Sequence, residues 1–458
     1  MPGQGWAVMQ MRILMRMICI YLGLSIFWAC LGKKLALVAE EPQVSKSLAS
    51  IVAALTAASF VQATQAQQSA PTVEELWIIV QRQQAEIAEL RGLLTSAEQE
   101  IESTGQRLEE TAQQVEATVG FVETLDVSSQ SDTTTIGGYG ELHYNNLAAD
   151  GGGETQEIDY HRFVLFFGHR FNDRVRFFSE LEVEHSLAGD GAPGEVELEQ
   201  AYVDFALNDT LAAQAGLFLL PVGILNETHE PPTFYGVERN DVENIIIPST
   251  WWEAGGGLRG NLANGLSWDF AIHSGLAMPT AGGSAFRVRS GRQKVAEAMN
   301  SDWAYTGRLR YSGIPGLELS ASYQYQTDPS QVPGDGLDSG SLFTTHAIYQ
   351  AGDFSLRALY GRWSFDGAAV ELADDDEQSG WYLEPSYRLN SRWGVYARYE
   401  DLEGARDSDE FTQWEAGFNF WPVPDVVLKF DYRQRDHELP GLAAADFDGF
   451  DLGLGYQF

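Results

Sequence analysis

The last ten residues of the chain, Gly449 to Phe458, read GFDLGLGYQF. Apolar and aromatic side chains occupy every second position of this stretch, and Asp, Gly and Gln lie between them. A period of two is the pattern of a β-strand with one apolar and one polar face. A soluble domain rarely ends on such a strand, whereas a membrane-spanning barrel needs one, because its last strand pairs with its first to close the sheet. The C-terminus therefore favours a transmembrane β-barrel over an edge strand of a soluble sandwich.

The composition fits this fold class. Among 458 residues there are 46 glycines and 12% aromatics, yet the mean hydropathy is -0.21, as expected for strands that are apolar on one face only. The formal net charge of -36 and the sequence pI of about 4.4 argue against nucleic acid as a partner. We expect no cofactor.

The first 66 residues contain two candidate export signals. The hydrophobic run Met17 to Leu31 is flanked by basic residues and could be a membrane anchor. A better-formed signal follows, with Lys46, an apolar stretch from Leu48 to Val61 and small residues before Gln67. Tandem signals are unusual, so we expect residues 1–43 to be an over-extended reading of the gene and 44–66 to be the signal peptide. Both cysteines lie in the first run, which leaves the mature chain without any.

Residues 70–126 carry a heptad repeat that predicts an α-helical coiled coil in the periplasm. Its register does not slip, and a helix on a globular core would instead drift toward a 3.6-residue period. The a positions are Val73, Val80, Ile87, Leu94, Ile101, Leu108, Val115 and Val122. Such a seam indicates an oligomer, but β-branched residues at a fit two strands or three. The alternative is a short plug or a flexible linker.

From residue 133 to the C-terminus the period changes to two. Sixteen candidate strands run from 133–146 to 449–458, and tight turns such as Asn172-Asp173 alternate with long Gly-rich or acidic loops. Short turns at one rim and long loops at the other are typical of an outer-membrane barrel, whereas a β-sandwich mixes its loop lengths. Residues 133–458 are therefore expected to form an all-β barrel in the outer membrane of a Gram-negative bacterium, surrounded by lipid and lipopolysaccharide.

The longest loop, Pro221 to Ser249, would be the third external loop. Its position and length favour folding into the barrel, where it would narrow the channel; the alternative is a surface loop. The charged residues expected at this constriction are Glu227, Glu230, Glu238, Arg239, Asp241 and Glu243.

Alternation also assigns the residues of the inner wall. The acidic ones are Glu180, Glu182 and Glu184, and strand four adds Glu197 and Glu199. The basic wall comprises Arg308, Arg310, Arg357, Arg388, Arg398, Lys429, Arg433 and Arg435. Acid on the third loop would face arginine across the pore, and such a transverse field selects hydrated, dipolar solutes. Alternatively, these charges pair and brace the wall.

Aromatic residues and histidines bear on two further questions, the membrane interface and catalysis. Aromatic residues near strand ends are interpreted as a girdle at the membrane interface: Trp251, Trp252, Tyr305, Tyr325, Tyr387, Trp414 and Trp421. The eight histidines are scattered and form no catalytic group or metal-binding spacing in the sequence. We therefore predict neither an enzyme nor a metal site.

Several segments resemble one family. They are GGYGELHYN (137–145), HRFVLFFGHRFNDRVRFFSELEVEH (161–185), ELEQAYVDF (197–205), GLFLLPVG (216–223) and NETHEPPTFYGVERN (226–240). Residues 133–458 are similar throughout to the phosphate-selective porins O and P. The resemblance implies a trimeric, sixteen-stranded channel, lined in some members by arginines and lysines that select phosphate. This chain departs from the family at 216–223, where a basic residue would be expected beside Phe218 and a phenylalanine at Val222.

The expected function is passive diffusion of small hydrophilic solutes through a homotrimeric porin. Anions such as phosphate are candidate solutes, with weak anion preference or near-neutrality and no high-affinity phosphate site. A carbohydrate porin is one alternative, although such barrels have eighteen strands. A structural tether, with the coiled coil reaching peptidoglycan, is the other.

Overall fold

The computed structural model describes residues 77, 133–437, 441–442 and 445–458. The predicted export region and, apart from Trp77, the predicted coiled coil lie outside these residues. Among the described residues no helix is long and apolar enough to cross a membrane.

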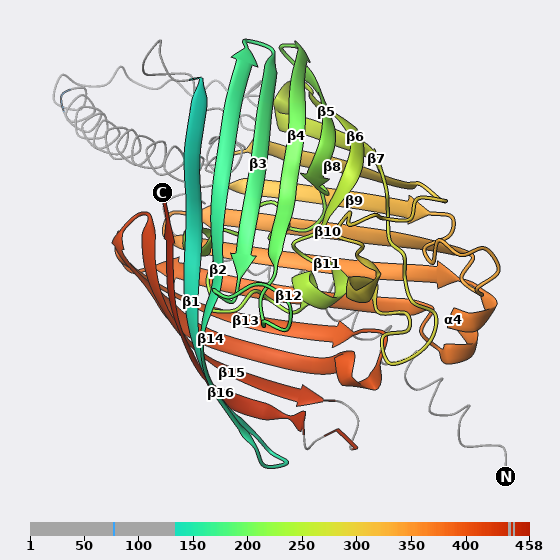
Figure 1. Ribbon diagram of the computed structural model, residues 1–458. Helices are drawn as coiled ribbons and strands as arrows, with labels where there is room; N and C mark the ends of the chain where they lie inside the picture. The colour runs from blue at the N-terminus through green and yellow to red at the C-terminus, as the bar shows by residue number, and fades with distance from the viewer. Residues whose placement is uncertain (1–76, 78–132, 438–440, 443–444) are drawn as a thin grey trace, which may run out of the picture. The chain divides into compact units, whose positions relative to one another are not determined.

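A closed barrel of sixteen antiparallel strands forms the described part of the chain, which confirms the predicted fold class and strand number (Figure 1). Each strand pairs with its sequence neighbours, and β1 pairs with β16. The strands are β1 Thr134–Ala149, β2 Glu154–Asn172, β3 Val175–Glu184, β4 Val196–Asn208, β5 Leu211–Leu219, β6 Trp252–Asn261, β7 Leu266–His273 and β8 Ala304–Ile314. They continue with β9 Leu317–Gln326, β10 Ser339–Ala351, β11 Phe354–Asp366, β12 Glu377–Arg388, β13 Trp393–Glu403, β14 Glu410–Val423, β15 Val426–His437 and β16 Phe447–Gln457.

The C-terminal strand closes the sheet as its alternation predicts. Tyr139 lies opposite Gln457, and the pairing runs without a shift to Ala149 opposite Phe447. The backbone N–H of Gly138 donates to the carbonyl of Phe458 at 2.9 Å, so the seam extends to the last residue. On β16 the side chain of Asp451 is buried inside, whereas Leu452 and Leu454 are exposed outside. This outward apolar face suits lipid.

The two ends of the barrel differ. At one, here called the turn end, neighbouring strands are joined by tight turns, and Asn264 and Gly265 both have positive φ (64° and 75°), as a type I′ turn requires. At the other, the loop end, the connections are long. A short helix, α4 (Ala368–Ala373), lies in one of them.

Residues 220–251, between β5 and β6, fold into the barrel as expected; we call them the inner segment. Its contacts reach strands far from its own ends. The backbone N–H of Val237 donates to Asp431 on β15 at 2.7 Å, that of Asp241 to Glu400 on β13 at 2.7 Å, and Trp363 on β11 donates to the carbonyl of Ile246 at 2.8 Å. The inner segment also contains a 3₁₀ turn, η2 (Pro231–Thr233), and a π-helical turn, η3 (Val242–Ile246).

An apolar core lies inside the barrel, where the sequence led us to expect a polar wall. The inner faces of β10–β14 contribute Leu342, Leu359, Trp363, Phe365, Tyr382, Leu402 and Phe411, and the inner segment contributes Ile224, Val242, Ile246 and Ile247. Residues 274–303, the β7–β8 connection, add Leu276, Met278, Phe286 and Val288. Removing these side chains from water stabilises the inner segment against this half of the wall.

Three residues predicted for the interfacial girdle belong to this interior. Trp251 is fully buried, with its ring centroid 6.1 Å from that of Trp363, and Trp252 is also buried. Trp421 is buried and meets Tyr235 of the inner segment edge-on. Their assignment to the girdle was wrong, because alternation identifies a face of the sheet but not what covers it. Tyr305, Tyr325, Tyr387 and Trp414 are exposed on the outside, as expected.

Candidate functional site: the charged lumen

The acidic residues of the inner segment are paired with cations of the wall. Glu227 forms an ion pair with Arg308 on β8, and Asp241 with Arg435 on β15. Glu238 accepts from His143 at 3.1 Å and Asn145 at 2.9 Å, both on β1. Burial opposes its ionisation, but the cations of His143 and Arg433 hold the pKa of Glu238 well below its usual range. These charges therefore do not face one another across an open pore, and of the two alternatives the bracing arrangement is the one observed.

Two predicted wall arginines are likewise neutralised. Arg398 is buried on β13 and contacts Glu384 (3.2 Å), Glu400 (2.9 Å) and Glu415 (2.8 Å) on three adjacent strands. Arg433 on β15 pairs with Asp451 on β16 at 2.5 Å. A buried guanidinium with carboxylates fixes neighbouring strands but offers little to a passing anion.

The other predicted basic residues have partners of a different kind. Arg357 donates to the carbonyl of Thr233 at 2.9 Å, and Lys429 donates to that of Gly236 at 2.8 Å. The guanidinium of Arg388 lies 3.6 Å from the ring centroid of Trp421. Arg310 approaches Ser267 at 3.5 Å. Two of these cations thus bind the backbone of the inner segment.

Two of the predicted acidic residues of β3 are buried, and the third lies at the end of the strand. Glu180 is buried and accepts from Gln200 at 2.7 Å, with His229 of the inner segment 3.3 Å away. Glu182 is also buried, 3.6 Å from Arg162 on β2, and Glu184 ends β3 at the loop end.

Two other acids of the inner segment are buried within it. Glu230 immediately precedes η2. Glu243 accepts from the backbone N–H groups of Ile224 (2.5 Å) and Leu225 (2.7 Å) and from the hydroxyl of Tyr382 (3.0 Å). Glu243 is therefore an internal brace and not a constriction charge, which corrects its predicted role.

A cluster of three arginines lies near the loop end, on the inner segment and the β7–β8 connection. Arg239 donates to the hydroxyl of Thr250 (2.9 Å), Arg289 to the carbonyl of Ser249 (2.7 Å) and Arg292 to the carbonyl of Thr250 (2.5 Å). Among the described residues, no carboxylate forms an ion pair with any of the three. The charge of these guanidiniums is therefore not offset by a directly contacting carboxylate.

Glutamates of β3 and β4 lie close enough to this arginine cluster to act on its charge. Burial lowers the pKa of Arg292, and the carboxylates of Glu197, Glu199 and Glu184 oppose that shift. Lys294 of the same connection contacts Glu195 (2.5 Å) and Glu197, which ties the connection to β4. Besides the acids that pair with wall cations, the infolded segments thus also carry cations, which lie near acids of β3 and β4.

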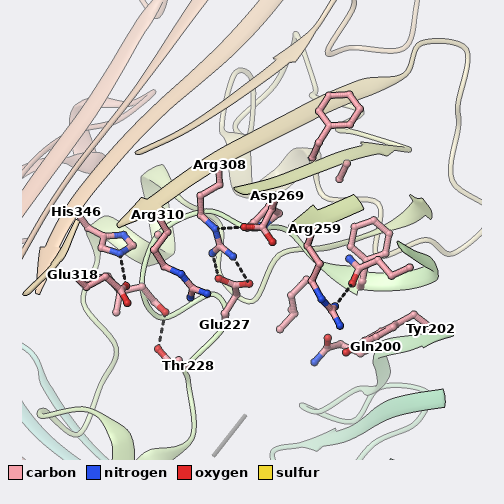
Figure 2. Close-up of a pocket in the computed structure, with 18 of the residues that line it drawn as sticks. Gln200, Tyr202, Glu227, Thr228, Arg259, Asp269, Arg308, Arg310, Glu318 and His346 are labelled. Carbon is pink, nitrogen blue, oxygen red and sulfur yellow. Dashed lines mark hydrogen bonds and ion pairs between the residues drawn. The ribbon is translucent and has the colours of Figure 1, made fainter. Parts of the chain in front are cut away.

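Two adjoining cavities open toward the turn end. One has a volume of about 360 Å³ and is lined by the underside of the inner segment and by β3–β11; the other, of about 440 Å³, reaches the turns at Asp173 and Asp209. Figure 2 shows the first cavity, with Arg308 between Asp269 and Glu227, and with Arg259 and Arg310 nearby. The residues shared by both cavities are Arg176, Arg259, Asn261, Asp269 and Arg310.

Arg239 of this cluster was among the predicted site residues, whereas Arg289 and Arg292 were not. The sequence nevertheless carries a signal for these two arginines. Residues 284–294 read SAFRVRSGRQK, an unusually basic run in a chain with 29 Lys and Arg against 65 Asp and Glu. Its position between two strands, however, gives no sign that it enters the barrel. Its apolar residues Phe286 and Val288, both buried, anchor it inside.

An apolar outer surface, a segment folded across the lumen and charged cavities together define an outer-membrane porin. The chain belongs to the family described as phosphate-selective porin O and P, which residues 135–458 match. A relative from Aquifex aeolicus (strain VF5), described as an uncharacterized protein, is 30% identical over 343 residues, covering 66% of this chain and 76% of the relative.

Solved structures support the fold. The Salmonella typhi OmpF complex with daunomycin superposes with a TM-score of 0.50 at 14% identity, covering 71% of this chain and 97% of that one. The anion-selective porin from Comamonas acidovorans gives the same TM-score and identity, covering 71% and 99%.

Proposed function

We propose that the chain forms a homotrimeric porin through which small hydrophilic solutes diffuse passively, with a weak preference for anions. The observation that carries this proposal is the cluster of Arg239, Arg289 and Arg292, which lies close to the glutamates of β3 and β4. A solute at that point exchanges part of its hydration for fixed charges of both signs, which favours polar molecules over apolar ones.

The preference for anions should be weak. Glu184, Glu197 and Glu199 lie near the arginine cluster and oppose its attraction for an anion. Charges beyond a Debye length of about 8 Å are largely screened in physiological salt. At the turn-end cavities Arg259 is paired with Asp204 at 2.9 Å, and Arg310 and Arg357 supply a modest positive surface.

A high-affinity phosphate site is not expected in this channel. Phosphate would have to displace carboxylates that already bind Arg308, Arg398 and Arg433, and a buried, hydrogen-bonded ion pair is costly to break. The stretch beside Phe218, where the family resemblance would supply a basic residue, is apolar and buried.

Two features support the trimer: the heptad repeat of residues 70–126, which calls for an oligomer, and the trimeric state that the family resemblance implies. The sixteen strands speak against a sugar porin, for which eighteen are expected. A tether to peptidoglycan through the coiled coil is compatible with channel activity and remains a second candidate for the N-terminal region alone.

Conductance in planar bilayers tests the proposal. Purified full-length protein should give discrete steps, and reversal potentials in a salt gradient should show weak anion preference. Replacing Arg239, Arg289 and Arg292 together by Gln should shift the preference toward cations, whereas Arg362→Gln, on an exposed pair with Glu377, should not. Absence of conductance steps would refute the porin, and unchanged selectivity in the triple variant would refute the role of the arginine cluster.

A further inference from the structure

Three histidines that are far apart in the sequence meet near the loop end of the barrel. His143 lies on β1, His161 on β2 and His185 just after β3. The rings of His143 and His161 are stacked, with centroids 4.6 Å apart and planes at 12°, and the ring of His185 meets that of His161 edge-on at 5.6 Å. The pairing of β1 with β2, which places His143 opposite Asp159, brings these imidazoles together.

One carboxylate joins two of the rings. Oδ2 of Asp159 lies 3.0 Å from Nδ1 of His161 and 2.8 Å from Nδ1 of His185. The backbone of His185 is in the left-handed region (φ 51°), and its N–H donates to the carbonyl of His161 at 3.2 Å, which holds the side chain over β2. The side chains of Asp159, His161 and His185 are 16% to 33% exposed, so these three residues are open to solvent at the loop end.

We propose that Asp159, His161 and His185 bind a divalent transition-metal ion of the Zn²⁺ type. Two imidazole nitrogens and one carboxylate oxygen are a common protein ligand set for Zn²⁺, with water in the remaining position. Bond lengths of about 2.0–2.2 Å in a tetrahedral site place ligand atoms about 3.3–3.6 Å apart. In this trio the ligand atoms all lie within 4.8 Å of one another, and the two distances above require only a slight spreading.

The surrounding residues favour an ion of this kind. Mixed nitrogen and oxygen ligands select zinc, nickel or copper over Ca²⁺ and Mg²⁺, which prefer oxygen alone. Arg162, next to His161 in the sequence, is paired with Glu141 at 2.7 Å, so its positive charge is offset beside the trio. His143, whose ring stacks on that of His161, is paired with Glu238 at 3.1 Å, so its positive charge is also offset beside the site. These two residues form a second trio with His161 and therefore share a ligand with the proposed site.

A further trio consists of Glu180, Glu199 and His229. Its ligand atoms also lie close together, but all three side chains are buried. A hydrated ion reaches the solvent-exposed trio without opening the interior, whereas it would have to displace packed residues to reach the buried one. The buried trio is nevertheless distinguished by the experiment.

Calorimetric titration of the full-length protein in detergent with Zn²⁺ tests the inference. We expect one ion per chain bound by wild type, and loss of affinity by at least about 100-fold in His185→Ala and in Asp159→Asn, because removal of even an outer-shell partner costs about 10–100-fold. His437→Ala is the matched control: His437 pairs with Asp446 at 2.9 Å, and among the described residues no second imidazole joins that pair. It should bind as wild type does.

A second measurement distinguishes the loss of a metal ligand from misfolding of the variant. X-ray absorption at the zinc edge should show two imidazoles in the bound wild-type protein and fewer in the His185→Ala variant, whose folded state is checked by heat-modifiable migration. Binding that survives Asp159→Asn and His185→Ala but disappears in Glu180→Gln would assign the ion to the buried trio and overturn the proposal. So would wild-type protein that binds no Zn²⁺, in which case Asp159 merely shares protons with two imidazoles. Neither readout depends on channel activity.

Discussion

Glu227 of the inner segment forms an ion pair with Arg308 on β8, and the same guanidinium donates to Asp269 on β7 at 2.8 Å (Figure 2). One cation thus joins the segment to two strands of the wall at the edge of the turn-end cavity. Arg308 is nearly inaccessible, whereas the side chain of Glu227 is 36% exposed. Glu227 is therefore the member of the pair that a solute in the cavity encounters.

Replacing Glu227 by Gln should make the channel more anion-selective. The substitution removes one negative charge beside the cavity and leaves Arg308 with Asp269 as its one carboxylate partner among the described residues. A solute in the cavity passes within the Debye length of about 8 Å, so salt does not fully screen the change. Reversal potentials in a potassium chloride gradient measure the effect. Arg308→Gln should shift the potential the other way, and Glu371→Gln, exposed on α4, should leave it unchanged. A shift of Glu227→Gln toward cations would contradict this account of the cavity.

Removing Arg398 should destabilise the barrel strongly. Arg398→Ala leaves three buried carboxylates, Glu384, Glu400 and Glu415, without their shared cation, and breaking a buried ion pair in this way costs about 3–5 kcal/mol. The temperature at which the folded band disappears on heating before electrophoresis reports the loss.

Arg362→Ala provides the comparison for Arg398. It breaks a pair whose members are 43% and 56% exposed, and such exposed pairs contribute about 0–1 kcal/mol. If both variants melt at the same temperature, the buried network does not support the wall. Partial recovery in Arg398→Gln combined with Glu415→Gln would identify uncompensated charge as the cause.

Truncating Trp363 should loosen the inner segment. Its ring is fully buried and stacks on Phe365 at 5.2 Å, and its Nε1 donates to Ile246 at 2.8 Å, so Trp363→Ala creates a cavity and costs about 3–5 kcal/mol. We expect larger and noisier single-channel steps in bilayers as the segment moves. Trp381→Ala, on the exposed outer face, should leave the step size unaltered.

Deleting residues 70–126 tests the predicted coiled coil. If the seam adds stability to a trimer that the barrels also hold together, the truncated protein remains trimeric by crosslinking in detergent but dissociates at a lower temperature. Full-length protein that is monomeric at every concentration would disprove the heptad interpretation.

The strands and their closure were predictable because alternation is a local property. In GFDLGLGYQF the polar and apolar faces are legible without any partner, and tight turns mark where strands end. The infolding of the inner segment was predicted differently, from its length and its place as the third external loop, which folds inward in porins. What alternation does not reveal is whether an inward face meets water or protein. Trp363 and Phe365 both point inward and are apolar, a pattern intelligible only once the inner segment covers them.

The site residues were harder to predict because they depend on tertiary pairing. Glu227 and Arg308 were both assigned to the lumen, but nothing in the sequence indicates that they neutralise each other. The spacing of His143, His161 and His185 in the sequence matches no metal-binding motif. These residues meet only through the pairing of β1, β2 and β3. Chemistry assembled by strand register escapes any search for motifs.

The inner segment has a consequence for assembly, since it spans the seam where the first and last strands join. Val237 donates to Asp431 on β15, the adjacent Glu238 accepts from Asn145 on β1, and Asn145 in turn donates to Asp451 on β16 at 2.7 Å. The first two of these hydrogen bonds exist only with the segment inside the barrel, whereas the third joins β1 and β16 directly. The middle of the chain thus holds together its two ends, because the segment is bonded to β1 and β15, the two strands that flank β16.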